Sequence, residues 1–200
     1  MPANKHIKTN KVDFLHIIKV FLLNNYNSKY NNNFGKNMST NTLILGSKIP
    51  AFSLKGIDEK IYSNQSFTKR GLIVIFSCNH CPYVQAYEQR IINLQKKFEE
   101  DIQFLAINAN DAVKYPDDSF EEMKIRAKKI GFNFPYLHDE TQEVAKLFDA
   151  THTPEIFFFN DKRELIFHGK IDDYWQEEKL AKAKYLENAI IEFLNGEEIS

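Results

Sequence analysis

Two cysteines, Cys78 and Cys81, are the only thiols in this 200-residue chain. They form a C-x-x-C motif that is followed directly by Pro82, after a run of apolar residues and at the start of a segment with helical spacing. Unpaired backbone N–H groups and the helix dipole stabilise a thiolate at the start of a helix. We therefore expect Cys78 to be an exposed nucleophile of lowered pKa. Cys81, one turn later, would attack the mixed disulfide that Cys78 forms.

Two other uses of a C-x-x-C motif fit this sequence less well. A zinc site would need a second pair of Cys or His at ligand spacing, and the chain has no further cysteine. A structural disulfide closing so short a loop would remove little entropy from the unfolded chain. We expect a redox pair, with neither a metal nor an organic cofactor.

His80 directly precedes Cys81 and is the residue expected to tune the pair. An imidazole here can donate a hydrogen bond to the Cys78 thiolate, which would stabilise the reduced form and make the disulfide more oxidising. The alternative interpretation is a surface histidine at the helix start that has no redox effect. Asn79, between Cys78 and His80, is a candidate for tuning or for facing the substrate.

The charge and composition of the chain argue against a nucleic-acid partner and against a disulfide scaffold. The formal net charge is −1, and lysines and glutamates are interspersed, so no basic face for nucleic acid is expected. Because no cysteine lies outside the motif, the chain is not a disulfide scaffold, and a reducing or an oxidising compartment could house it.

Residues 1–40 differ in composition from the rest and are expected to be a poorly ordered, Asn-rich extension. Their basic start and apolar run resemble a signal peptide, but His16 and Lys19 interrupt the run and no small-residue cleavage site follows. The run is also too short and too polar to span a membrane. We expect a cytoplasmic protein that starts at Met1 or at Met38, whereas cleavage within residues 23–37 would indicate a periplasmic one.

From Gly46 onward the sequence is typical of a globular α/β domain. Residues 49–54 and 61–63 predict a short hairpin, and the continuous apolar run 72–76 predicts a buried strand. A helix follows Pro82, and residues 102–107 form the next strand. This βαβ unit places the cysteines at the carboxyl end of a central strand, where open α/β sheets carry their sites.

The second half of the domain alternates helices with short strands. Asp118 and Ser119 are expected to cap a helix that ends at Gly131, and Asp139 with Gln142 resembles a capping box. Three polar residues after the second strand and two before the last helix are interpreted as loop and cap formers: Asn108, Asn110, Asp111, Asp172 and Asp173. The other expected elements are an extended piece at 134–137, a helix through 144–148, an antiparallel hairpin of 155–159 with 164–167, and a helix through 183–193.

This order of elements resembles the thioredoxin fold, over about residues 46–199. More narrowly, it is similar to a bacterial group in the alkyl hydroperoxide reductase and thiol-specific antioxidant superfamily. The runs that carry this resemblance are residues 78–84, 115–120, 134–145, 153–155 and 169–173. The resemblance implies a central mixed β-sheet flanked by helices, with an N-terminal β-hairpin extension.

The resemblance also implies further site residues. Thr153 and Pro154 should form a cis-proline loop that faces the cysteines and offers its backbone to an extended peptide. Thioredoxins carry a buried carboxylate on the strand before the motif, and residues 72–77 have none. Glu155 is the candidate replacement, or else a solvated charge at a strand end. Where many relatives have a further cysteine, this chain has His152.

Together these features predict a thiol–disulfide oxidoreductase that exchanges its dithiol with disulfide-bearing proteins or small molecules. A thioredoxin or glutathione system would supply its electrons. One alternative is an antioxidant thiol peroxidase in which Cys78 attacks peroxide, although the Pro and Thr that precede a peroxiredoxin's cysteine are absent. The other is a non-enzymatic Cu(I) carrier with His152 as third ligand, although copper-assembly relatives space their cysteines one residue wider.

Overall fold

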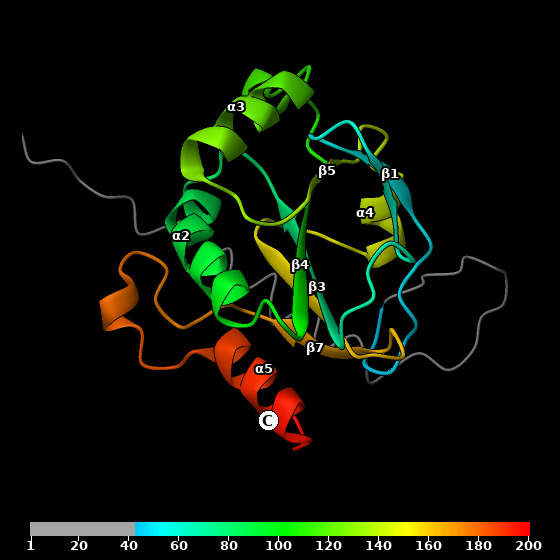
Figure 1. Cartoon of the computed structure of the whole chain (residues 1–200). Coiled ribbons are helices and arrows are strands. Elements are labelled where there is room, and N and C mark those ends of the chain that lie inside the picture. The colour runs from blue at the N-terminus through cyan, green and yellow to red at the C-terminus, as the bar shows by residue number, and fades with distance from the viewer. Residues whose placement is uncertain (1–42) are drawn as a thin grey trace, which may run out of the picture. The chain divides into compact units, whose positions relative to one another are not determined.

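The computed structural model describes residues 43–200 (Figure 1). The chain divides into two units, Met1–Thr40 and Asn41–Ser200, of which only the second is described here. The predicted Asn-rich extension and the alternative start at Met38 therefore lie outside the described residues. Within residues 43–200, no helix is both long and apolar enough to cross a membrane.

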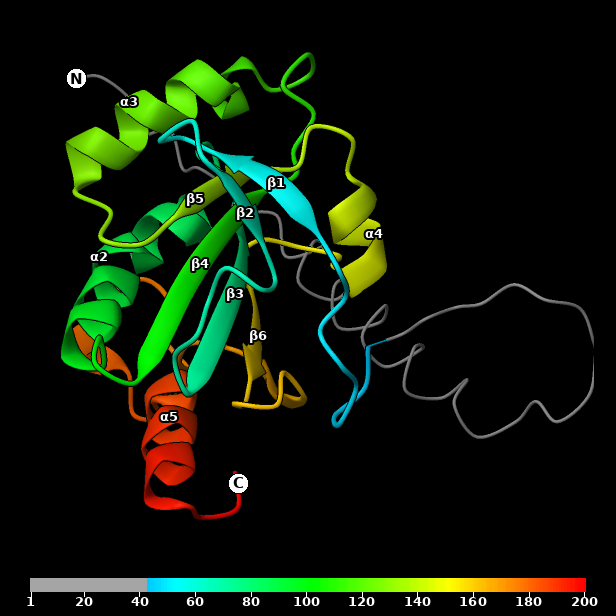
Figure 2. The same cartoon turned by 45° about the vertical axis from the view of Figure 1, so that its right-hand side comes forward.

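A seven-stranded mixed sheet forms the centre of the domain, in the order β2-β1-β5-β4-β3-β6-β7 (Figure 2). Neighbouring strands β3, β4 and β5 run parallel, whereas β1, β2, β6 and β7 pair antiparallel with their neighbours. The strands are β1 (Ser53–Gly56), β2 (Ile61–Ser63), β3 (Gly71–Ser77), β4 (Ile102–Asn108), β5 (Tyr136–His138), β6 (Glu155–Phe159) and β7 (Leu165–Gly169).

Strand β3 is buried on both faces because it lies between β4 and β6 and helices cover both sides of the sheet. Successive side chains of a strand point to opposite faces. Accordingly, Ile73 and Ile75 join one apolar cluster, while Leu72, Val74 and Phe76 join the other. The continuous apolar run in the sequence is thus explained, and the predicted central strand is confirmed.

Helices cover both faces of the sheet, as the positions of α2 and α4 in Figure 1 show. The first cluster contains side chains from α2, α3 and α5, and the second contains side chains from α4. The helices are α2 (Pro82–Lys97), α3 (Phe120–Ile130), α4 (Glu143–Phe148) and α5 (Tyr185–Asn195), with 3-10 turns η2 (Pro116–Asp118) and η3 (Glu178–Leu180). This arrangement is the predicted α/β thioredoxin fold.

Helix caps confirm one prediction and correct another. Ser119 caps α3 by accepting from the N–H of Glu122 at 3.4 Å, and Gly131 ends this helix at φ 81°. The capping box predicted for α4 is wrong, because Gln142 is its N-cap and adopts a left-handed conformation. The buried carboxylate of Asp139 still accepts an N–H of this helix, from Ala145 at 2.8 Å.

The N-terminal hairpin is confirmed, but its first strand is displaced along the sequence. Strand β1 covers Ser53–Gly56 rather than residues 49–54, and it pairs with both β2 and β5. Ile49 instead donates its N–H to the carbonyl of Arg163 at 2.8 Å. Pro50 has no N–H for a ladder, which favours beginning the strand after it.

Candidate active site

The C-x-x-C motif connects the end of β3 to the start of α2. Pro82 occupies the first helical position, where its fixed φ and missing N–H suit a helix, and Cys81 is therefore the N-cap, at φ −72° and ψ 122°. Cys78 lies in the loop before the helix. The predicted helix after Pro82 is confirmed.

The two thiols differ in exposure, in the order opposite to the expected one. Cys78 is only 2 % exposed, whereas Cys81 is partly exposed. Burial raises the pKa of the Cys78 thiol to about 11, because the hydrogen bonds from Thr153 and from the Cys81 backbone lower it by less than desolvation raises it. The prediction of an exposed Cys78 of low pKa is wrong.

The loop at Thr153 and Pro154 faces both cysteines. The Thr153–Pro154 peptide bond is cis, as the resemblance implies. The Thr153 hydroxyl lies 3.2 Å from Sγ of Cys78, and the Cys81 thiol donates to the Thr153 carbonyl over 3.6 Å. The predicted apposition of this loop and the dithiol is confirmed.

A buried carboxylate, that of Asp118 in η2, lies beneath the motif. It accepts four hydrogen bonds: from Asn79 N at 2.5 Å, from His80 Nδ1 at 2.5 Å, from Asn108 Nδ2 at 3.2 Å and from Asn110 Nδ2 at 3.0 Å. Burial alone would raise the pKa of Asp118, but the hydrogen bonds from Asn110, Asn79 and His80 outweigh burial and hold this pKa below its usual value. Asp118 is therefore held as an anion.

Asp118 was predicted only as a helix cap, a position that Ser119 takes instead. One of its carboxylate oxygens, a ring nitrogen of His80 and Sγ of Cys78 all lie within 4.8 Å of one another. The negative charge of Asp118 contributes to the raised pKa of Cys78. The sequence signal that points to it is the run 115–120, which is part of the family resemblance.

The ring of His80 is held by two neighbours, neither of which is a cysteine. Its Nδ1 lies on the Asp118 carboxylate, and the ring stacks on Tyr115 with centroids 4.4 Å apart and planes 12° apart. In the described part of the chain no hydrogen bond joins His80 to Cys78. The predicted donation to the Cys78 thiolate is thus absent, and an effect of His80 on the reduction potential stays a prediction.

Asn79 points into the domain and does not face a substrate. Its side-chain amide donates to the carbonyl of Asp117 at 2.6 Å, and its Oδ1 accepts from the hydroxyl of the buried Tyr136 at 3.1 Å. The expectation of a substrate-facing Asn79 is therefore corrected. Asn108 and Asn110, interpreted from sequence as loop formers, instead help to hold Asp118.

Glu155 is buried, so its interpretation as a solvated strand-end charge is wrong. Its carboxylate accepts from Thr151 N at 2.7 Å, from His152 N at 3.2 Å and from His168 Nε2 at 2.9 Å. Desolvation opposes ionisation, but the hydrogen bond from His168 and those from the backbone lower the pKa of Glu155 overall. Among residues 43–200 no hydrogen bond joins it to a cysteine, so Asp118 is the carboxylate within reach of Cys78.

His152 does not belong to a cluster of metal ligands. Its side chain is 64 % exposed, and its Nδ1 lies 3.1 Å from the Thr151 hydroxyl. Within the described residues, the only group of three that could hold a metal ion is Cys78, His80 and Asp118. The predicted role of His152 as a third copper ligand is therefore not supported.

An open pocket of about 280 Å³ adjoins the cis-proline loop. Its lining is mostly polar and comes from the ends of β3 and β4, from α4 and from residues 151–153. The lining residues that carry polar side chains are Ser77, Asn110, Gln142, Lys146, Thr151, His152 and Thr153. The pocket gives a polar rim to the side of the dithiol on which Thr153 lies.

A dithiol at the end of a central strand, opposite a cis-proline loop, defines a thioredoxin-like protein. Residues 45–168 match the AhpC/TSA family, and the chain belongs to this family. No protein in a search of curated sequences matches it.

Several solved structures share this architecture. An uncharacterized conserved protein from Geobacillus kaustophilus is 32 % identical, with a TM-score of 0.75, over 84 % of this chain and 91 % of that one. A hypothetical protein from Sinorhizobium meliloti is 28 % identical, also with a TM-score of 0.75, over 80 % and 88 %. A putative thiol:disulfide interchange protein DsbE from Chlorobium tepidum is 13 % identical over 78 % and 98 %, with a TM-score of 0.60, and shares the fold.

Proposed function

We propose that this protein is a thiol–disulfide oxidoreductase whose redox pair is Cys78 and Cys81. The observation that carries the proposal is the placement of both sulfurs against Thr153, at 3.2 Å and 3.6 Å from its oxygens, at the carboxyl end of β3. Membership in a family of thiol oxidoreductases and peroxidases supports redox chemistry in general.

The exposure of the two thiols supports an assignment of roles opposite to the one expected from sequence. Cys81 is the partly exposed thiol, at the N-cap of α2. Cys78 is buried and has a raised pKa. Cys81 is therefore the attacking thiol, and Cys78 resolves the intermediate.

The reaction then follows from two exchanges. The Cys81 thiolate attacks one sulfur of a substrate disulfide, forms a mixed disulfide and releases the other sulfur as a thiolate. Cys78 loses its proton and attacks Sγ of Cys81, which forms the Cys78–Cys81 disulfide and releases the second substrate thiolate. Two electrons pass to the substrate, and an external thiol reductant restores the dithiol.

The proton of Cys78 needs an acceptor at the second exchange. The Asp118 carboxylate lies within 4.8 Å of Sγ of Cys78 and is hydrogen bonded to His80, which is partly exposed. We assign the proton to this pair, which can pass it on to solvent through the imidazole. The charge of Asp118 also disfavours a thiolate at Cys78 before the mixed disulfide has formed.

Limited alkylation of the reduced protein tests the roles. We expect iodoacetamide to label Cys81 at least about tenfold faster than Cys78 at pH 8, measured by mass spectrometry of the peptides, because exposure and thiolate fraction govern the rate. The Cys81→Ser variant should label slowly and Cys78→Ser quickly. Faster labelling of Cys78 would reverse the roles, and failure of the oxidised protein to form an internal Cys78–Cys81 disulfide would overturn the function itself.

The reduction potential decides the direction of electron flow. Equilibration with glutathione buffers should give a value near about −270 mV for a reductant, or about −180 to −120 mV for a disulfide donor. Replacing His80 by Pro removes the imidazole that contacts Asp118. The same assay then measures whether this imidazole changes the reduction potential of the Cys78–Cys81 pair. An unchanged potential would show that His80 only shapes the loop.

A thiol peroxidase is the second candidate, because the chain belongs to the AhpC/TSA family. In this case the Cys81 thiolate would attack hydrogen peroxide, break its O–O bond, become a sulfenic acid and release hydroxide, and Cys78 would condense with the sulfenic acid to give the disulfide and water. Peroxide consumption by the wild type, abolished in Cys81→Ser, would favour this candidate. Disulfide exchange without peroxide consumption would exclude it.

We propose that a thioredoxin or glutathione system reduces the pair and that the protein works in the cytoplasm. N-terminal sequencing of the native protein tests the second proposal. A terminus at residue 1, 2 or 38 would agree with it, whereas a terminus within residues 23–37 would indicate export.

A further inference from the structure

Two exposed aromatic side chains, one of them in the first turn of α2, are not used in the exchange itself. Tyr83 belongs to the first turn of α2, two residues after Cys81, and is 51 % exposed. Trp175 follows β7 and is 38 % exposed. Their ring centroids are 4.7 Å apart and their planes meet at 65°, an edge-to-face contact. Trp175 is the only tryptophan of the chain.

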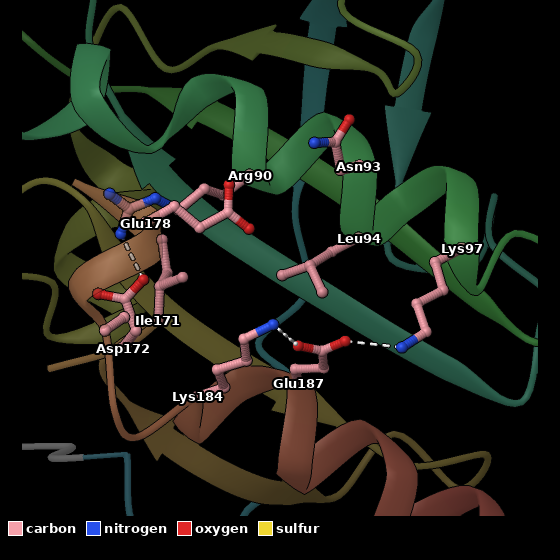
Figure 3. A pocket seen from close by; sticks show the side chains of 10 residues that line it. Arg90, Asn93, Leu94, Lys97, Ile171, Asp172, Glu178, Lys184 and Glu187 are labelled. Carbon is pink, nitrogen blue, oxygen red and sulfur yellow. Dashed lines mark hydrogen bonds and ion pairs between the residues drawn. The ribbon is translucent and has the colours of Figure 1, made fainter. Parts of the chain in front are cut away.

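The buried side chain of Arg90 holds the backbone at Trp175 in place. The Arg90 guanidinium donates to the carbonyls of Tyr174 and Trp175, each at 2.9 Å. It also forms an ion pair with the buried carboxylate of Asp172, drawn in Figure 3. Asp172 in turn accepts from the hydroxyl of Tyr87 at 2.8 Å. Helix α2 therefore contacts this loop at Asp172, Tyr174 and Trp175.

These contacts mean that the loop is held in place before any ligand arrives. The carbonyls of the loop and the Asp172 carboxylate satisfy the buried Arg90 cation, and the side chains of Tyr83, Tyr174 and Trp175 are exposed. A rigid aromatic surface loses little entropy on binding. We name Tyr83 and Trp175 together the aromatic platform.

The neighbouring pocket between α2 and α5 combines the apolar side chains of Leu94 and Ile171 with several ion-paired groups. It is small, about 100 Å³, and Figure 3 shows its lining of charged groups. Glu187 pairs there with both Lys97 and Lys184, at 2.7 Å and 3.1 Å. Those charges bind one another and hold α5 on α2, whereas the aromatic platform lies at the other end of α2, beside Cys81.

The position of the aromatic platform in the chain indicates which kind of ligand it could contact. A disulfide that reaches Sγ of Cys81 lies at the N-terminus of α2, and Tyr83 belongs to the first turn of this helix. A small disulfide has no side chain long enough to cover both rings. A polypeptide with an aromatic or aliphatic side chain next to its cysteine does, and aromatic contacts of this kind stabilise a complex.

We propose that the aromatic platform binds an apolar side chain adjacent to the reactive cysteine of a polypeptide substrate, so that protein disulfides rather than small thiols are the substrate class. This inference rests on the proposed thiol–disulfide exchange. It assigns substrate selection to residues that take no part in the transfer of electrons.

Matched substrates test the inference. One is a disulfide-linked peptide with Phe next to its cysteine, the second replaces that Phe by Ser, and the third is hydroxyethyl disulfide. We expect wild-type kcat/KM to be at least about fivefold higher for the Phe peptide than for the Ser peptide. Tyr83→Ala and Trp175→Ala should remove this preference and leave the rate with hydroxyethyl disulfide unchanged.

Two further variants control for folding. Trp175→Phe keeps an aromatic ring and should restore the preference, while Leu180→Ala changes an exposed apolar residue in η3 and should have no effect. An equal loss on all three substrates, or no loss of preference, would overturn the inference alone. A wild-type protein inactive on every disulfide would overturn the proposed function as well.

Binding can also be followed without turnover. Because Trp175 is the only tryptophan, intrinsic fluorescence of a Cys78→Ser, Cys81→Ser variant reports on the platform directly. We expect the reduced Phe peptide to change the emission saturably and the Ser peptide to require at least about fivefold higher concentrations. Identical titrations would contradict the inference.

Discussion

Cys78 keeps its proton because two features of its surroundings oppose a negative charge. The thiol is buried, and the Asp118 carboxylate adds an unfavourable charge nearby. Partial compensation comes from the Thr153 hydroxyl and from the backbone N–H of Cys81. In the resolving role that we propose for it, Cys78 would stay inactive until a mixed disulfide forms within its reach.

The raised pKa of Cys78 makes the stability of the reduced protein depend on alkaline pH. Its folded-state pKa of about 11 lies above the reference value of 9.0, so its stabilising contribution is complete below pH 9 and is lost as pH rises to about 11. Two pKa units correspond to about 2 to 3 kcal/mol. Between pH 8 and pH 11.5, the free energy of unfolding measured in urea should fall by about 2 to 3 kcal/mol more for the wild type than for Cys78→Ser. Equal losses would contradict the burial of this thiol.

Replacing Asp118 by Asn should make Cys78 more reactive. The substitution keeps the shape of the side chain and removes the like charge, and a charge this close typically shifts a pKa by one unit or more. In a Cys81→Ser background we expect Cys78 to be alkylated about tenfold faster at pH 8.

Asp117 provides the matched control for this prediction. Its backbone carbonyl contacts Asn79, but its carboxylate lies outside the cluster of Cys78, His80 and Asp118. Asp117→Asn should leave the alkylation rate within about twofold. Equal acceleration by both variants would indicate that the loop had opened, not that a local charge had been removed.

Helix α2 connects the chemistry to the rest of the fold. Its N-terminus carries Cys81, and its buried Glu88 binds Arg126 of α3 through two hydrogen bonds of 2.6 Å and 2.7 Å. Since Asp118 directly precedes α3, this pair also fixes the distance between the cysteines and the carboxylate beneath them.

Breaking the Glu88–Arg126 pair should be costly. We expect Glu88→Gln to lower the free energy of unfolding by about 2 to 4 kcal/mol, because Arg126 would lose its charged partner in a largely buried place. Glu121→Gln removes an exposed partner of Lys124 and should cost less than about 1 kcal/mol. Chemical denaturation of both variants measures the difference, and similar values for the two would refute the argument.

Local sequence patterns are sufficient to predict most elements but not the arrangement of the site. The apolar run of β3, the proline at the start of α2 and the glycine that ends α3 each act within a few residues. The exposure of Cys78 depends on Thr153, 75 residues away, and the partners of Asp118 come from segments up to 39 residues distant. Such contacts leave no periodic signal, so the sequence places the two cysteines at the strand–helix junction but does not show that Cys78 is the more buried of them.

At the scale of the whole molecule, two apolar clusters on opposite faces of one sheet support the site. Every contact described for the dithiol lies within the second unit, Asn41–Ser200. The composition of residues 1–40 predicts a poorly ordered extension, so we expect a chain that begins at Asn41 to unfold at the same denaturant concentration as the full chain and to label Cys81 at the same rate. A loss of more than about 1 kcal/mol would contradict this prediction.

The shielding of Cys78 by Thr153 also has a consequence for synthesis. Cys78 emerges from the ribosome 75 residues before the threonine that covers it, and β6, which flanks β3 on one side, follows Thr153. At about 5 to 20 residues per second, translation needs about 4 to 15 s to close this interval. During that time both thiols of the nascent chain are open to oxidants, so the protein is most vulnerable to wrong disulfides before it has folded.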